Sequence, residues 1–149
     1  MKVANPLNTL SAYSSWGLLL IRLAFGFQLI MGTQDNVFSW ERMLEFRDFL
    51  EAQGMPYPLL AAHVSVYAQF GAGILWVLGL FTRWAALVMV INFIVALLLV
   101  HVGLPYEQNI LAINLLAVSC CLLLTGPGRL SLDARLLRQP SSKEAILAP

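Results

Sequence analysis

Three long segments of this chain, 59–82, 84–106 and 108–128, contain no charged residue. An α-helix rises about 1.5 Å per residue, so roughly 20 apolar residues cross the hydrocarbon layer of a membrane, which is about 30 Å thick. A fourth apolar segment, 14–33, is interrupted by Arg22 alone. The alternation of apolar and polar residues that marks a membrane β-barrel is absent from the sequence. It therefore predicts an all-α, four-helix transmembrane bundle with up-down topology, with spans at about 14–33, 59–81, 84–103 and 108–125.

The composition points the same way. Charged residues make up 11% of the 149 residues, whereas a soluble domain carries about a quarter. So few charges cannot cover the surface of a soluble core of this size. A cleaved signal peptide is the alternative for the first span, but it would have a shorter apolar core followed by small residues. The first span contains Arg22 and runs into MGTQDN, so we expect it to be retained.

The basic residues predict how the spans are oriented, because loops rich in Lys and Arg stay on the cytoplasmic side. In an up-down bundle, only Arg42 and Arg47 lie on one side, among acidic residues. The other side receives Lys2, Arg83, Arg129, Arg135, Arg138 and Lys143. We therefore expect a multi-pass protein with both termini in the cytoplasm. Residues 1–138 are expected to form one membrane domain, followed by a flexible cytoplasmic tail at 139–149.

The loop between the first two spans predicts a helix of its own at about 39–53. Ser39 can cap the start of this helix, and Gly54 can end it. Apolar residues recur every three or four positions, which makes the helix amphipathic and places it on the outer membrane face. These apolar residues are Trp40, Met43, Phe46 and Leu50. The helix either closes the mouth of the bundle as a lid or simply connects two spans.

Four stretches of the sequence carry a resemblance to a known family. LIRLAFG, FLEAQGMPYP, GAGILWVLGLFTRWAAL and LLLTGPGRLSLD follow one another from about Leu20 to Asp133. In order and spacing they resemble the DoxX family of DoxX- and DoxD-like small membrane proteins. The resemblance implies a four-helix protein of the bacterial inner membrane that takes part in membrane redox work. Relatives include a quinone-reducing thiosulfate oxidoreductase subunit and part of an oxidative-stress complex, so quinone is the implied ligand and a redox protein the implied partner.

The chain departs from the family pattern at three positions. Many relatives carry a His–Gly pair and then a Lys at the end of the first span, and a Glu in the second span. This sequence has Met31, Asp35 and Gln69 in place of that His, Lys and Glu. Chemistry that requires those side chains is therefore not expected here. Other positions match the family pattern: Arg22, Arg83, Gly126, Pro127, Gly128 and Asp133.

Polar side chains inside the spans are the candidate ligand-binding residues. Counted at about 1.5 Å per residue from the inner boundary, an inner layer holds Arg22, Gln69 and Asn92. An outer layer holds His101 and Asn114, with Glu107 just beyond them. We expect these six side chains to contact a ligand within the bundle. His101, whose ordinary pKa lies near neutrality, is expected to exchange protons together with Glu107.

Arg22 raises a specific question, because a charged side chain near mid-bilayer costs about 2.5–3.5 kcal/mol on insertion scales. No acidic residue lies at its predicted depth. Gln69 and Asn92 offer two amide oxygens, fewer than the five donors of a guanidinium can use. A ligand oxygen, a water or a lipid phosphate would complete the set, or the side chain snorkels to the headgroups. If a ligand does so, replacing Arg22 with leucine should reduce ligand retention without unfolding the protein.

The remaining polar residues predict structural roles or exclude whole classes of function. Arg83, Arg129 and Asp133 are expected to form a salt-bridged clasp at the inner surface. A metal site built from the two histidines and Glu107 is not expected, because their helical phases do not converge. No haem-ligand pair is apparent either, so neither metal nor haem is expected. Basic residues are too few and too scattered for nucleic-acid binding.

Three functions remain open at this point. The first is a small non-catalytic or quinone-binding subunit of a membrane oxidoreductase complex, whose redox cofactor belongs to a partner protein. The second is a non-enzymatic scaffold or assembly factor for a partner membrane protein, and the third is transport of a small solute. Membrane lipids are expected contacts in each case, and the sequence leaves homo-oligomerisation open.

Overall fold

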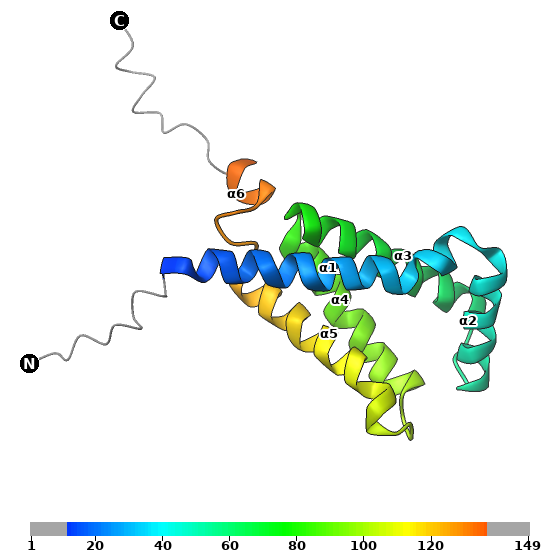
Figure 1. Cartoon of the computed structure of the whole chain (residues 1–149). Helices are drawn as coiled ribbons and strands as arrows, with labels where there is room; N and C mark the ends of the chain where they lie inside the picture. The colour runs from blue at the N-terminus through cyan, green and yellow to red at the C-terminus, as the bar shows by residue number, and fades with distance from the viewer. Residues whose placement is uncertain (1–11, 137–149) are drawn as a thin grey trace, which may run out of the picture.

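The structure, a computed structural model, describes residues 12–136 and contains no strand in that range (Figure 1). Its helices are α1 (Ser14–Phe38), α2 (Trp40–Ala52), α3 (Pro58–Leu78), α4 (Thr82–Val95), α5 (Tyr106–Thr125) and α6 (Leu132–Leu136), and α4 continues as the π-helix η2 (Ala96–Val100). Four of them are long and apolar enough to cross a membrane: α1, α3, α4 with η2, and α5. The predicted bundle of four transmembrane helices is therefore confirmed. The predicted tail at 139–149 lies outside the described residues.

Three spans end at different residues than the sequence predicts, and the second of them ends at Leu78 rather than near residue 81. α1 continues past Thr33, whose hydroxyl donates to the carbonyl of Leu29 within the helix (2.7 Å). It ends only at Phe38, and at Ser39 the backbone becomes extended with φ of −123° and ψ of 118°. The third span ends at Val100 rather than near residue 103, because the chain turns at His101.

The four spans form two closely packed pairs. α1 packs along α3, α4 packs along α5, and α3 also contacts α4. α1 and α5 lie close together near α6 and diverge toward α2 (Figure 1). We call the end of the bundle that holds α6 the terminal end, and the opposite end the α2 end. The main apolar core lies between the four spans, and among its buried members are Leu29, Trp76, Met89 and Leu122.

α2 runs across the bundle at the α2 end (Figure 1). A separate apolar cluster holds it against α3 and η2: Met43, Leu50, Ala62, Val66 and Val100. The predicted cap is confirmed, because Ser39 Oγ accepts from the backbone N–H of Arg42 (3.4 Å). Trp40 differs from the rest of the predicted apolar stripe, since it is 60% exposed and lies beside the ring of His63. α2 is thus an amphipathic helix that covers one end of the bundle.

The structure corrects the predicted salt-bridged clasp of Arg83, Arg129 and Asp133. The two carboxylate oxygens of Asp133 accept hydrogen bonds from the backbone N–H groups of Phe81 (2.8 Å) and Thr82 (3.0 Å). The carboxylate therefore caps the start of α4, where the helix dipole favours negative charge. Arg83 donates to a main-chain carbonyl at the end of α5 (3.3 Å), and Arg129 is exposed. Backbone N–H groups rather than guanidinium groups hold the Asp133 carboxylate, because the donors at the start of α4 lie closer to it.

Replacing Asp133 with asparagine should lower the stability of the protein by about 1–2 kcal/mol. An amide has only one acceptor oxygen, so one of the two N–H groups loses its partner. Phe81 adds to the loss, because its φ of 47° is strained for a side chain with a Cβ. Thermal unfolding in detergent measures the effect, with Asp35→Asn as control since Asp35 is exposed. Equal melting temperatures for the two variants would contradict this role of Asp133.

Candidate functional site

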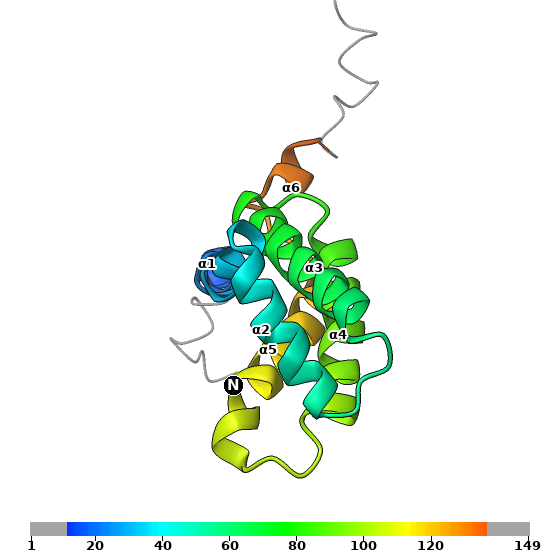
Figure 2. The same ribbon diagram turned by 90° about the vertical axis from the view of Figure 1, so that its right-hand side faces the viewer.

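A cavity of about 630 Å³ lies between α3, α4 and α5, and α2 lines one end of it. Figure 2 looks onto this end of the bundle, with α2 in front of the spans. The volume falls within the range of sites that hold small organic molecules, about 300–1,000 Å³. The wall is mostly apolar, and three of its residues, Val64, Ile91 and Leu111, are exposed on the outside of the bundle. The cavity is therefore open at its side, where lipid would surround the spans.

Polar side chains reach the wall of this cavity from three spans: Ser65, Gln69, Asn92, His101 and Gln108. Gln69 Nε2 donates to Ser65 Oγ (2.9 Å). This bond uses one of the two amide hydrogens of Gln69. Asn92 Nδ2 is buried and has no hydrogen-bond partner among residues 12–136. A buried donor without a partner costs free energy, which an acceptor on a bound molecule would recover. The wall thus combines a large apolar surface with a few polar side chains, one of which is a buried donor without a partner.

His101 lies at the mouth of the cavity near the α2 end, where a second polar residue holds its ring. Its Nδ1 lies 2.7 Å from Asn109 Oδ1. Asn109 Nδ2 donates to the carbonyls of His101 (3.4 Å) and Leu104 (3.1 Å). The amide therefore fixes the imidazole against the turn that joins η2 to α5.

The π-helix η2 brings two further residues to the cavity. The backbone N–H of His101 donates to the carbonyl of Ala96, five residues earlier (2.9 Å), and so closes the wider turn. Ala96 and Val100, the first and last residues of η2, both line the cavity wall. Short π-helical segments occur frequently at functional sites, because they redirect side chains without breaking a helix.

The structure brings together three of the six predicted ligand-binding residues. Gln69, Asn92 and His101 line the cavity, which therefore joins residues of both predicted polar layers. Asn114 and Glu107 are exposed on α5, whose buried face consists of Ala112, Leu115, Ser119 and Leu122. Glu107 instead stands in the first turn of α5, where a carboxylate complements the helix dipole. These two predicted residues therefore do not line the cavity.

Arg22 does not join Gln69 and Asn92, and the predicted shared layer is wrong for this residue. Its guanidinium is only 1% exposed and donates to the carbonyls of Pro127 (2.6 Å) and Leu130 (2.9 Å). Depth counting misplaces it because the loop after α5 folds back beside the early turns of α1. Arg22 is therefore a structural anchor of the terminal end, remote from the cavity.

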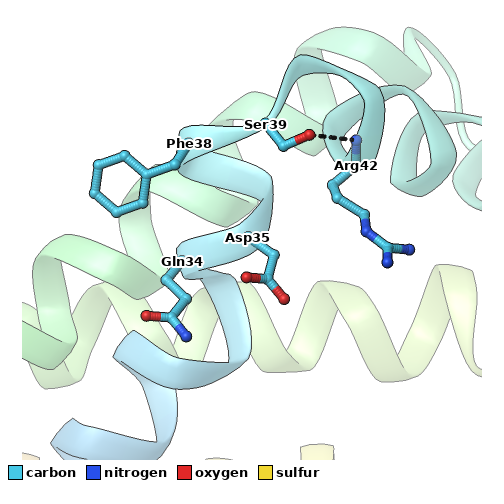
Figure 3. A pocket seen from close by; sticks show the side chains of 5 residues that line it. All are labelled: Gln34, Asp35, Phe38, Ser39 and Arg42. Carbon is cyan, nitrogen blue, oxygen red and sulfur yellow. Dashed lines mark hydrogen bonds between the residues drawn. The ribbon is translucent and has the colours of Figure 1, made fainter.

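A second hollow lies at the corner between α1 and α2, and its five labelled side chains do not converge (Figure 3). Phe38 points away from Asp35 and Arg42, and Ser39 is engaged in capping α2. Arg42 Nη1 donates to Glu45 Oε2 (2.7 Å), and this bond raises the pKa of Arg42 above its ordinary value. Because its charged groups are exposed and already paired or solvated, this hollow is a weaker candidate for a binding site.

Gln108 and Asn109 belong to the site but were not predicted from the sequence. Both lie in the first turns of α5, just after the Gly103 and Pro105 turn. A polar pair at the start of a span ordinarily faces headgroups, so its place within the span does not distinguish it. The signal was the short spacing of eight residues between His101 and Asn109, across a turn that reverses the chain.

The chain resembles known proteins over much of its length. The sequence model of the DoxX family matches residues 17–102, more than half of the chain. This range includes Gln69, Asn92 and His101 but not α5. The inner membrane protein YphA of Escherichia coli (strain K12) is 29% identical over 126 residues, which cover 78% of this chain and 83% of YphA. No solved structure matches the chain.

Proposed function

This chain belongs to the DoxX family of integral membrane proteins, and we propose that it binds a quinone or similar lipophilic molecule in the cavity between α3, α4 and α5. It does so in the bacterial inner membrane, with both termini in the cytoplasm, as a small subunit of a membrane redox system. The redox cofactor belongs to a partner protein. Gln69 and Asn92 offer polar contacts deep in the cavity, and His101 offers one at its α2 end.

The observation that carries this proposal is the cavity itself. An apolar wall suits the alkyl chain of a membrane-soluble molecule, and convergent polar groups suit its oxygens. The exposed apolar residues at the side opening, among them Val64 and Ile91, would let such a molecule enter from the lipid without crossing water. The neutral amide of Gln69 stands where many relatives carry a Glu, so the site supports binding without an ionisable group at that position.

The proposal predicts that filling the cavity removes the ligand. We expect organic extracts of the purified protein to contain near-stoichiometric quinone, identified by mass spectrometry. Ala68→Leu adds bulk to the cavity wall and should reduce the retained amount about tenfold or more, since added methylenes in a packed site cost about 1–3 kcal/mol. Ala117→Leu makes the same change on the exposed face of α5 and should leave retention unchanged. Extracts that contain only bulk phospholipid in all three proteins would refute the proposal.

A second candidate function, a scaffold for another membrane protein, is favoured by an aromatic surface on α2 and α3. The ring centroids of Trp40 and His63 lie 5.7 Å apart, and those of His63 and Tyr67 lie 6.0 Å apart. Trp40 and Tyr67 are 60% and 52% exposed. This surface lies on the side of α3 opposite Ser65 and Gln69, so it is independent of the cavity.

The scaffold function is tested by crosslinking from the aromatic surface. A photoreactive residue at Tyr67 should capture one defined membrane protein in cells, and the same residue at Leu20 on α1 should not. Capture restricted to Tyr67, together with a protein free of bound quinone, would favour the scaffold over the redox subunit. Lipid adducts alone at both positions would dispose of the scaffold.

A further inference from the structure

We infer that the cavity selects a ligand whose polar head carries a hydroxyl group, such as an alkylphenol or a hydroquinone, and that this hydroxyl donates to Nε2 of His101. The inference rests on the proposed function, because it assigns the chemical class of ligand for the same cavity. It goes further by stating which end of the cavity holds the head and which hydrogen-bonding character the head must have.

The contacts of Asn109 determine the orientation of its side-chain amide. Its nitrogen lies within hydrogen-bond distance of two carbonyl oxygens, those of His101 and Leu104. Carbonyl oxygens only accept, so the group facing them must be the NH₂ of the amide. The other end of the amide, Oδ1, is therefore the atom that faces His101 Nδ1 at 2.7 Å. The alternative flipped amide would set an oxygen against two oxygens.

The contact with Asn109 also determines which nitrogen of the His101 imidazole carries the hydrogen. Asn109 Oδ1 can only accept, so His101 Nδ1 must carry a hydrogen and donate it. In a neutral imidazole the other nitrogen then has no hydrogen, and Nε2 is an acceptor. His101 is one of the residues that line the cavity, and no residue in the described part of the chain bonds its Nε2. The α2 end of the cavity therefore presents an acceptor in a fixed position.

The acceptor at His101 Nε2 distinguishes ligands by whether their polar head can donate a hydrogen bond. A hydroxyl on a ring can donate to Nε2, whereas a carbonyl or an ether oxygen cannot. An oxygen without a hydrogen would also bring two lone pairs together when water is displaced. A hydroquinone or phenol thus fits this end of the cavity better than the corresponding quinone or ether. Its alkyl chain then follows the apolar wall between α3 and α4.

A pair of probes that differ only in the donor tests the inference without redox chemistry. We expect para-octylphenol to bind the purified protein about three- to tenfold more tightly than para-octylanisole, its methyl ether, in calorimetric titrations. His101→Leu removes the acceptor and should bring the ratio of the two dissociation constants close to one. His63→Leu removes the histidine on the outer aromatic surface and should preserve the ratio. Equal binding of the two probes to the wild-type protein would overturn the inference.

The same titrations separate this inference from the proposed function. If neither probe binds, or if Ala68→Leu leaves both affinities unchanged, the cavity is not a ligand site and both fail. If both probes bind equally and Ala68→Leu weakens both, the cavity stands and only the hydroxyl preference falls. Because the wild-type ratio decides the matter, a poorly folded His101→Leu protein would not protect the inference.

Replacing Asn109 tests whether this residue positions the imidazole of His101, because a purely structural role of Asn109 would not change the tautomer of that ring. Nitrogen NMR of the histidine side chains should show hydrogen on Nδ1 of His101 in the wild-type protein. Asn109→Leu removes the acceptor that fixes this tautomer, so hydrogen should shift toward Nε2 and the phenol preference should shrink. An unchanged tautomer and an unchanged preference in Asn109→Leu would contradict the positioning role of Asn109.

Discussion

Replacing Arg22 with leucine is expected to destabilise the protein by about 2–4 kcal/mol and to leave ligand retention per folded molecule unchanged. The carbonyls of Pro127 and Leu130 would lose donors at 2.6 and 2.9 Å in a place that water does not reach. Each carbonyl left without a partner costs about 1–3 kcal/mol, and the gain from no longer burying a charge offsets part of the sum. Thermal unfolding in detergent, alongside mass spectrometry of the extract, measures both effects.

Two further variants sharpen this prediction. Arg22→Lys should lie between the wild type and Arg22→Leu, because an ammonium keeps the charge but lacks the planar fork that reaches two carbonyls. Arg129→Leu removes an exposed cation from the same end of the molecule and should change little. A stable Arg22→Leu protein that has lost its ligand would instead restore Arg22 as a ligand-binding residue. That outcome would mean that the loop after α5 does not sit on α1 in the membrane.

Gly73→Ala is expected to lower stability by about 1–3 kcal/mol, because α1 and α3 touch through their backbones at this point. A Cβ on Gly73 would lie 2.7 Å from the carbonyl oxygen of Gly26, and a Cβ on Gly26 would lie 2.9 Å from that of Gly73. A backbone oxygen cannot rotate away as a side chain can, so the two helices would have to separate. The buried residues beside this contact, Leu29 and Trp76, would lose packing with them.

The chain offers a matched control on the same helix. A Cβ on Gly71 meets nothing within 4 Å. Gly71→Ala should therefore be neutral or stabilising by up to about 1 kcal/mol, as expected from helix propensity alone. The difference between the two variants isolates the helix contact from any general effect of alanine on α3. Equal melting temperatures for Gly71→Ala and Gly73→Ala would show that α1 and α3 do not approach this closely.

Part of the candidate site could be predicted from helical phase alone. Ser65 and Gln69 are four residues apart on α3, and His63 and Tyr67 occupy nearly the opposite side. The structure places the first pair on the cavity and the second on the outer aromatic surface. Helical phase was sufficient on α3 because one side of this helix faces the cavity and the opposite side faces outward. On α5, counting depth along the helix selected Glu107 and Asn114 but did not give the direction in which they face.

The amino-acid sequence by itself determined the number of spans, their order and the amphipathic helix between the first two. These features follow from local physics, since a backbone in lipid must satisfy its own hydrogen bonds and about 20 apolar residues suffice to cross. Only the tertiary structure decided which groups Arg22 and His101 contact. The partners of Arg22 lie 105 and 108 residues away in sequence, on a loop that folds back over α1. The role of His101 depends on a turn that sets Asn109 beside it, and neither contact is encoded in the periodicity of any single helix.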